Sequence, residues 1–308
     1  MTGIILSYAR EVELNGADAP SSASSQSAQI AQWYDGTLKT ISYTAPGDYV
    51  AIKYSGAGAA TLPLLHAGKP CFEIPQLGEA LLGICEAAKK KGVRVLVDAE
   101  QSAVQGGVDG WTVSLMRRFN TKDLAVVFNT YQMYLRRSPR TLREHVEIAE
   151  REGWRLGVKL VRGAYLASDP REDIWASKEE TDVAYDEAAG FLLRRERPVD
   201  LVVASHNTGS ILKAREVRRK VVREREGGKG ELGELGYAQL MGMADELSMS
   251  LVGGGEGKVY KYAVWGTTGE CVKYLVRRAE ENKDAVGRSG DNRRAVWDEL
   301  KRRRWGLA

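Results

Sequence analysis

Short apolar runs alternate along this chain with longer stretches whose apolar residues recur every three or four positions. The runs predict eight strands, at residues 4–7, 50–54, 93–97, 124–128, 156–161, 201–204, 237–241 and 259–264. Continuous apolar strands separated by helical patterns are typical of a parallel sheet covered by helices. The pattern therefore predicts the α/β class.

Two of the intervening stretches have clear helix signals. In 138–153, Ser138 precedes Pro139 at a favoured first helical position, and Gly153 ends the run. In 178–195 the apolar residues recur at helical spacing. The Ser-rich segment 16–29 is expected to be a loop. Eight strand–helix units favour a (βα)8 barrel over a doubly wound sheet, because no GxGxxG follows the first strand.

Composition fits one or two globular domains with a sizeable core: 308 residues, 43% hydrophobic and 28% charged. A net charge of only +4, with acidic and basic residues mixed, argues against a nucleic-acid-binding protein. The three cysteines lack CxxC spacing, so neither a zinc site nor a disulfide framework is expected. The first residues resemble neither a secretory signal nor a transit peptide.

Polar residues gather where the predicted strands end. In a barrel of this type the carboxyl ends of the strands converge on the active site. A lysine within an apolar strand is costly unless it is paired or faces a polar cavity. Lys53 and Lys159 are therefore expected to point into a site or to pair with Asp98, and internal ion pairs that only hold the barrel mouth remain an alternative. The residues concerned are Lys53, Asp98, Glu100, Asn129, Gln132, Lys159, Arg162, Ser205, His206 and Asn207.

A helix is predicted over 274–282, where Tyr274 is followed by the adjacent pair Arg277 and Arg278. Residues three and four apart share a helix face, so the tyrosine lies beside both guanidinium groups. Arginine binds a carboxylate with two hydrogen bonds and keeps its charge. This face suits a small carboxylate with an apolar body, although a solvated helix face would show the same pair.

An ordered series of motifs resembles the proline dehydrogenase family, in particular its fungal mitochondrial branch. The motifs are AIKYSGAG, VLVDAEQ, NTYQMYL, VKLVRGAY, ASHN, QLMGMAD, YKYAVWG and YLVRRAEEN, and the likeness extends from about residue 3 to beyond 281. The resemblance implies one distorted (βα)8 TIM-type barrel spanning 1–308, with a C-terminal helix over its mouth and FAD on its open face. It also implies oxidation of L-proline to 1-pyrroline-5-carboxylate, electron transfer to a membrane quinone with peripheral inner-membrane association, and a mitochondrial location.

The resemblance assigns roles to individual residues. The carboxylate clamp would be Arg277 and Arg278 with Lys53 as a third positive group, while Tyr262, Tyr274 and Leu240 would surround the ring and Tyr165 would close the site. Asp98 would orient Tyr262 and Lys53. The FAD side would comprise Asn129, Lys159, Arg162, Gly163, Ala164, His206, Asn207 and Glu281. Glu11 resembles an acidic residue that pairs with the first arginine, and no metal ligand is implied.

Two departures from the family pattern bear on function. Trp265 stands in a run where the family has proline, so a reshaped mouth is expected. The family's N-terminal helical region is expected to be absent. Alternatives to proline oxidation are a dehydrogenase for hydroxyproline or another cyclic imino acid, a lyase with Lys53 or Lys159 as Schiff-base amine, and a barrel without turnover.

Overall fold

Eight parallel strands hydrogen-bond side by side and close into a barrel in the order of the chain. The computed structural model describes residues 1–10, 23–197, 199–225, 231–255, 257–281, 297–298 and 300–304. The predicted (βα)8 barrel is confirmed, and a ninth helix follows the last strand. The strands are β1 (Gly3–Tyr8), β2 (Tyr49–Ile52), β3 (Arg94–Val97), β4 (Val127–Gln132), β5 (Gly157–Val161), β6 (Asp200–Ala204), β7 (Leu235–Leu240) and β8 (Lys258–Trp265).

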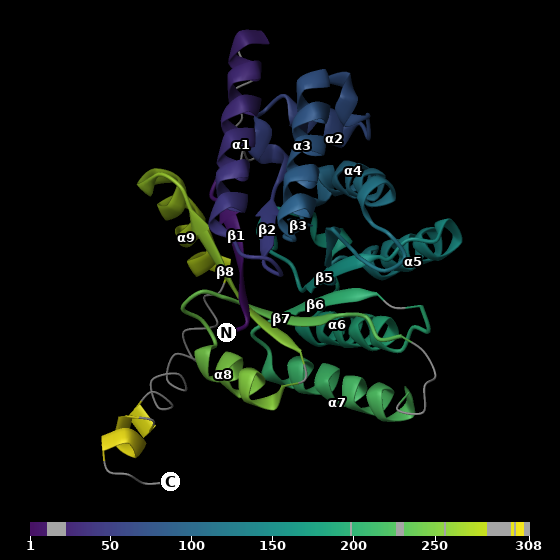
Figure 1. Cartoon of the computed structure of the whole chain (residues 1–308), viewed down its shortest axis with the longest axis vertical. Helices are drawn as coiled ribbons and strands as arrows, with labels where there is room; N and C mark the ends of the chain where they lie inside the picture. The colour runs from purple at the N-terminus through teal and green to yellow at the C-terminus, as the bar shows by residue number, and fades with distance from the viewer. Residues whose placement is uncertain are drawn as a thin grey trace.

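Helices surround the barrel, as Figure 1 shows, with α9 beside β8. Helix α5 begins at Ser138 and ends at Glu152, and Gly153 stops it in a left-handed conformation (φ 79°), as the sequence predicts. The left-handed conformation is unfavourable for residues that have a Cβ atom, whereas glycine adopts it without this steric cost. The helices are α1 (Ala23–Tyr43), α2 (Thr61–His66), α3 (Pro75–Lys91), α4 (Ser102–Phe119), α5 (Ser138–Glu152), α6 (Lys178–Leu193), α7 (Thr208–Arg225), α8 (Asp245–Gly254) and α9 (Thr268–Glu281).

Alternate strand residues form two apolar layers. One set packs between the sheet and the helices, and the other fills the barrel interior. In the interior, the Tyr49 ring meets the rings of Phe128 and Tyr260 edge-to-face, at centroid distances of 5.1 and 5.0 Å. Edge-to-face contact is a favoured geometry for aromatic pairs. These rings fill this part of the barrel interior, which leaves the carboxyl ends of the strands as the place for a cavity.

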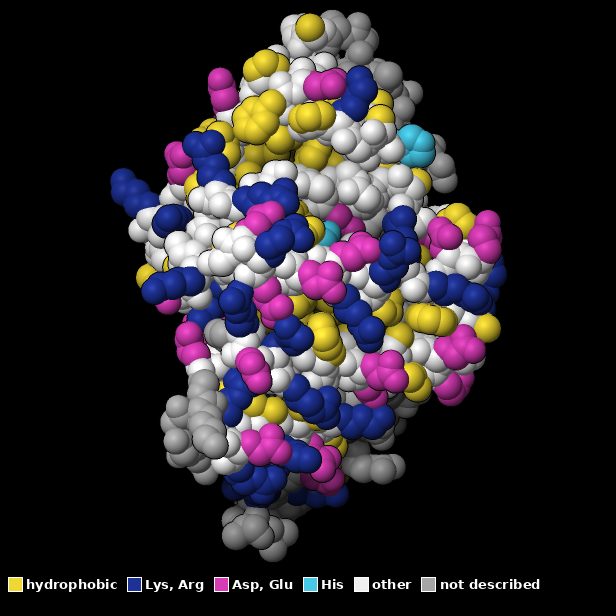
Figure 2. Space-filling view, turned by 90° about the vertical axis from the view of Figure 1, so that its right-hand side faces the viewer, with side chains coloured by type: hydrophobic (Ala, Val, Ile, Leu, Met, Phe, Trp, Pro, Cys, Tyr) yellow, Lys and Arg dark blue, Asp and Glu magenta, His cyan; other side chains and the backbone are white. Residues whose placement is uncertain are grey.

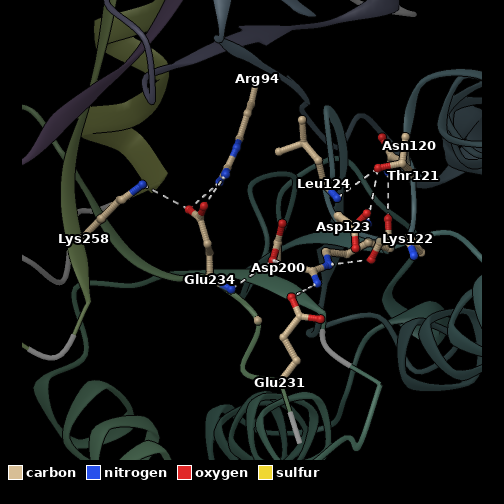
Figure 3. Close-up of polar contacts among 12 residues, drawn as sticks. Arg94, Asn120, Thr121, Lys122, Asp123, Leu124, Asp200, Glu231, Glu234 and Lys258 are labelled. Carbon is tan, nitrogen blue, oxygen red and sulfur yellow. Dashed lines mark hydrogen bonds and ion pairs between the residues drawn. The ribbon is translucent and has the colours of Figure 1, made fainter.

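Ion pairs close the opposite end of the barrel, where the strands begin (Figure 3). Arg94 binds both carboxylate oxygens of Glu234, at 2.8 and 2.6 Å, and Lys258 reaches Glu234 at 3.2 Å. Arg155 pairs with Asp200 and with Glu231. Because these side chains come from the starts of β3, β6 and β8 and from the segments that precede β5 and β7, they join strands that are distant in sequence.

The starts of β4 and α1 are among the bounds that differ from the sequence prediction. Strand β4 begins at Val127 rather than at 124. At this start, Asn120 Oδ1 accepts from the backbone N–H groups of Val126 and Val127 at 2.9 and 2.8 Å, so these two donors bond to a side chain instead of to a neighbouring strand. The polar residues expected beyond this strand are instead part of its ladder with β5. Helix α1 begins at Ala23, so residues 23–29 are helical rather than a loop. A buried face with Ile30 and Trp33 outweighs the weak helix preference of the serines.

Charges of both signs are interspersed on the face of the molecule seen in Figure 2. None of the helices in the described ranges combines the length and apolar character needed to cross a bilayer.

Candidate active site

A cavity of about 290 Å³ opens at the carboxyl ends of the strands, bounded by α9. Side chains from nearly every strand end reach it, as expected where parallel strands converge. The predicted site residues that line it are Lys53, Asp98, Lys159, Arg162, Gly163, Ala164, Tyr165, His206, Asn207, Leu240, Tyr262, Tyr274 and Arg278. Folding therefore gathers into one cavity most of the side chains that the sequence pattern singles out.

A buried carboxylate organises the centre of this cavity. Lys159 of β5 donates from Nζ to Asp98 Oδ1, and the Tyr262 hydroxyl of β8 donates to Asp98 Oδ2 at 2.6 Å. Asp98 and Lys159 are only 7% and 6% exposed. Burial lowers the pKa of Lys159, against the opposing pull of Asp98, and raises the pKa of Tyr262 well above its usual value. The charge of Lys159 thus depends on its partner.

A second lysine stands nearer the opening. Strand β2 ends at Ile52, so Lys53 follows the strand and is half-buried, rather than lying within the strand as predicted. Its Nζ donates to the Tyr165 hydroxyl at 3.2 Å, and that hydroxyl in turn donates to the Ala99 carbonyl oxygen at 3.4 Å. The positive charge of Lys53 contributes to the lowered pKa of Lys159. Two lysines therefore give the cavity an electropositive character around one carboxylate.

Helix α9 supplies an aromatic and cationic wall. The Tyr274 ring lies parallel to the Tyr262 ring, with 6.3 Å between centroids and 10° between planes. Arg278, one helical turn further along, holds its guanidinium carbon 5.3 Å from the centre of the Tyr274 ring. This confirms that a C-terminal helix covers the barrel mouth. The side chains of Arg277 and Glu281, and all of Glu11, lie outside the described residues.

Arg162 is held rigidly at the end of β5. Its Nε donates to Asp182 Oδ1 at 2.7 Å, and its two terminal nitrogens donate to the hydroxyls of Ser205 (2.6 Å) and Ser210 (2.8 Å). The guanidinium also lies 4.5 Å from the centre of the Tyr185 ring. Three of its five N–H groups are engaged in these bonds. These three bonds fix the orientation of the side chain at the cavity wall and leave its other two N–H groups for a ligand.

The start of α7 also faces the cavity. Asn207 Oδ1 accepts from the backbone N–H of Ser210 at 3.2 Å and so caps the helix. The backbone N–H of Leu240 donates to Nε2 of His206 at 3.1 Å, a bond that requires the neutral ring with its proton on Nδ1. The positive end of the helix dipole adds to the attraction of this wall for anions.

The position of Asn129 differs from the prediction that this residue contacts the cofactor. It is fully buried but does not line the cavity, and its Nδ2 donates to Asp109 Oδ1 of α4 at 2.9 Å. Successive residues of a strand point to opposite faces. Because β4 continues through residue 132, Asn129 faces the helices, whereas Thr130 and Gln132 face the cavity.

Trp265 also lies elsewhere than expected. Its ring packs outside the barrel against Tyr8 and Tyr43, and its Nε1 donates to the Thr40 hydroxyl of α1 at 2.9 Å. The expectation of a reshaped mouth is therefore wrong. The same alternation along β8 that turns Tyr262 inward turns Trp265 outward.

Some cavity residues have no strong sequence signal. Thr130 lies two positions before Gln132 on the same strand face, and Lys178 is the first residue of α6, directly after its cap Ser177. Strand periodicity could have indicated Thr130 once the true limits of β4 were known. In the part of the chain that the structure describes, no cluster of His, Cys, Asp and Glu could hold a metal ion.

The cavity presents two sets of groups, one on each side, that suit two different anionic ligands. On the β5 and β6 side, the cavity presents Arg162, Lys178 and the start of α7, which are the types of group that bind phosphates. On the β8 and α9 side, it presents the two parallel tyrosines and Arg278. Lys159 lies between them at the barrel centre. A phosphate-bearing cofactor and a small carboxylate substrate could therefore share the cavity.

Comparison with known proteins agrees with this geometry. The profile of the family described as proline dehydrogenase matches residues 1–290. A probable mitochondrial proline dehydrogenase of Schizosaccharomyces pombe is 34% identical over 257 residues, which cover 75% of this chain and 51% of that protein. Mitochondrial proline dehydrogenase 1 of Homo sapiens is 34% identical over 237 residues, covering 71% of this chain and 37% of the relative. The chain thus spans about half or less of the length of these relatives.

Solved structures share the fold. Proline utilization A (PutA) of Bdellovibrio bacteriovorus, inactivated by N-propargylglycine, superposes with a TM-score of 0.72 at 20% identity. The match covers 90% of this chain and 29% of that protein. The chain, with its closed barrel and its cavity under α9, belongs to the proline dehydrogenase family.

Proposed function

We propose that this protein is an FAD-dependent enzyme that oxidises L-proline to 1-pyrroline-5-carboxylate in proline catabolism. The observation that carries the proposal is the α9 wall, where the parallel rings of Tyr262 and Tyr274 adjoin the Arg278 guanidinium at the cavity. A small ring with three methylene groups and one carboxylate matches this pair of surfaces. Membership of the proline dehydrogenase family supports the assignment.

Substrate binding follows from the charges and shapes of the wall. Arg278 would bind the carboxylate, with Arg277 as a second clamp and Lys53 adding positive charge from the facing side. Tyr262, Tyr274 and Leu240 would enclose the ring, and Tyr165 would close the site. A desolvated arginine–carboxylate pair is strong because both partners lose competing water. Positioning a small rigid ring in this way contributes a large share of the rate enhancement.

Cofactor binding would fall to the β5 and β6 side. Arg162, Gly163, Ala164, His206 and Asn207 would hold FAD there, with Lys159 beside its ring system and Glu281 toward its far end. When bound, FAD would accept the hydride that leaves the carbon next to the proline nitrogen. A Cβ at Gly163 would collide with the Tyr134 ring, so this backbone segment lies closer to its neighbour than a side chain would allow.

The buried centre would keep the reacting groups in register. Asp98 fixes the Tyr262 hydroxyl and the Lys159 ammonium at once, so neither can turn away from the cavity. Lys159 and Arg162 would place positive charge beside the bound flavin, where electron density increases during the reaction, and so would lower the barrier without any movement of these groups. The substrate amine must be neutral to react, and the surrounding positive charges disfavour its protonated form.

Electron transfer to a membrane quinone, with peripheral inner-membrane association, belongs to the same proposal. So does a mitochondrial location, which the relatives named as mitochondrial proteins support. We further propose that residues 1–308 form a single proline dehydrogenase-like barrel domain.

An absorbance spectrum of the purified chain with FAD, before and after anaerobic addition of L-proline, tests the proposal. Bleaching of the flavin band is expected. The Arg278→Met variant should need far more proline for the same bleaching. Arg140→Met serves as the control, since the exposed Arg140 side chain pairs with Glu144 at the surface.

Other results would separate the alternatives. Bleaching by hydroxyproline in preference to proline would assign the enzyme to another cyclic imino acid. Bound flavin that neither substrate reduces would contradict the proposed reaction. A chain that binds no flavin but forms a borohydride-trapped adduct with a carbonyl compound through Lys53 or Lys159 would favour a lyase.

A further inference from the structure

Two loops that line the cavity are tied to one another away from it. One connects β3 to α4 and carries Asp98 and Ala99, and the other connects β5 to α6 and carries Ala164 and Tyr165. Near the cavity, Gln132 bridges the two loops, because its Nε2 donates to the Glu100 carbonyl oxygen at 3.0 Å and its Oε1 accepts from the backbone N–H of Ala164 at 3.1 Å. The Tyr165 hydroxyl also donates directly to the Ala99 carbonyl oxygen at 3.4 Å. At that length this last bond is weak. A second connection lies further out.

Asp169 provides that connection. Its carboxylate is buried, with 8% of the residue exposed. Oδ1 accepts from the backbone N–H of Ser102, the first residue of α4, at 2.9 Å, and Oδ2 accepts from the Tyr134 hydroxyl. Its own backbone N–H donates to the Tyr165 carbonyl oxygen at 2.8 Å. One residue therefore joins α4, the segment after β4 and the loop that carries Tyr165.

The helix has a specific need for this carboxylate. The first turn of α4 contains no acidic residue, and its cap residue Gln101 makes no side-chain hydrogen bond to the helix. The free N–H groups at a helix start attract negative charge. Asp169 supplies that charge from a distant loop, and α4 in return fixes the position of the loop.

Tyr134 extends the connection to the cavity wall. Its ring packs so closely on Gly163 that a Cβ there would collide with it. Its backbone N–H donates to the Arg162 carbonyl oxygen at 2.7 Å, and its carbonyl oxygen accepts from Trp175 N–H at 3.0 Å. The loop is thereby held at both of its ends as well as at Asp169.

We propose that Asp169 is a positioning residue for substrate binding. It has no contact with the cavity, and it acts by fixing the loop that carries Tyr165 against the loop that carries Asp98. The expected effect on KM rests on the proposed function. The clasp itself, defined as Asp169 with Ser102 and Tyr134, is a property of the chain without any ligand.

The kinetic consequence is a change in KM more than in kcat. A loosened loop spends part of its time away from the closed site, so substrate binds only to the closed fraction. Asp169→Asn keeps the size of the side chain but replaces one acceptor oxygen with a donor, so it cannot accept from both Ser102 and Tyr134. KM for L-proline is expected to rise about tenfold, and kcat to change by less than about threefold.

Asp173→Asn is the matched control. Asp173 lies in the same loop and also contacts Ser102, but only through the hydroxyl at 3.4 Å. It should leave KM within about twofold of the wild-type value, because a bond of that length contributes little. A second pair, Tyr165→Ala with and without Asp169→Asn, tests the route of action. If Asp169 acts through Tyr165, adding Asp169→Asn to the Tyr165→Ala variant should leave KM almost unchanged.

Amide hydrogen exchange of the protein without flavin gives a readout independent of turnover. Peptides covering 98–102 and 162–169 should exchange at least about tenfold faster in Asp169→Asn than in Asp173→Asn. Unchanged exchange would overturn the clasp, and faster exchange with unchanged KM would overturn the positioning role. If the wild-type protein binds flavin but proline does not reduce it, the proposed function is wrong, whereas the exchange result still decides the clasp.

Discussion

Asp98→Asn is the substitution whose effect the structure specifies most closely. It removes the negative charge that Lys159 contacts and leaves the side-chain shape almost unchanged. The two side chains are 10% and 8% exposed, so water cannot replace the lost partner. Removing one member of a buried pair costs about 3 to 5 kcal/mol. The free energy of unfolding should therefore fall by about 3 kcal/mol or more near neutral pH.

The loss should depend on pH. Burial already lowers the pKa of Lys159, and Asp98 opposes that shift, so the variant should lower it further. A folded-state pKa below the unfolded one means that the unfolded chain binds more protons, and stability then rises with pH. The slope is at most about 1.4 kcal/mol per pH unit, up to the ordinary lysine pKa of about 10.4. The deficit relative to wild type should therefore shrink as pH rises above neutral.

Urea unfolding followed by circular dichroism, at several pH values between about 7 and 10, measures this deficit. Glu73→Gln is the matched control, because Glu73 pairs with Lys69 at 3.2 Å with both side chains exposed. Such surface pairs contribute about 1 kcal/mol or less. If Asp98→Asn behaves like this control, with a small loss that does not vary with pH, Lys159 does not depend on Asp98 and the description of the buried centre is wrong.

Three further substitutions test other parts of the structure. Arg278→Met should raise KM for L-proline about tenfold or more, through loss of a charge-assisted pair, and steady-state kinetics that match wild type would exclude it from the clamp. Glu234→Gln should weaken the dependence of the free energy of unfolding on pH in acid. Hydrogen bonding to Arg94 lowers the pKa of Glu234 to about 2, so the stability that the Glu234 carboxylate contributes in the wild type is lost as pH falls from 4.5 toward 2. Trp265→Ala should lower the melting temperature yet leave KM near the wild-type value, because the ring packs on α1 outside the barrel; a large change in KM would place it at the mouth after all.

The sequence by itself determined the barrel and much of the site. Apolar runs at strand spacing and helix signals such as Pro139 and Gly153 are local, and they act before any tertiary contact forms. Polar residues at strand ends, such as Asp98 and Lys159, stand out because burying them in an apolar context is costly without partners. That cost made their convergence predictable.

Only the tertiary structure decided which way each of these side chains faces and what it contacts. Side chains of a strand alternate between its two faces, so an error in the limits of β4 assigned Asn129 to the cavity face instead of the face that packs on the helices. The same alternation along β8 turns Trp265 away from the barrel interior. The sequence offered both Lys53 and Lys159 as partners of Asp98, and the structure shows that Lys159 donates to it. This bond and the reach of Asp169 to the start of α4 join residues more than sixty positions apart. Such pairings depend on the closure of the barrel, which brings distant strand ends within hydrogen-bonding distance and which no local pattern encodes.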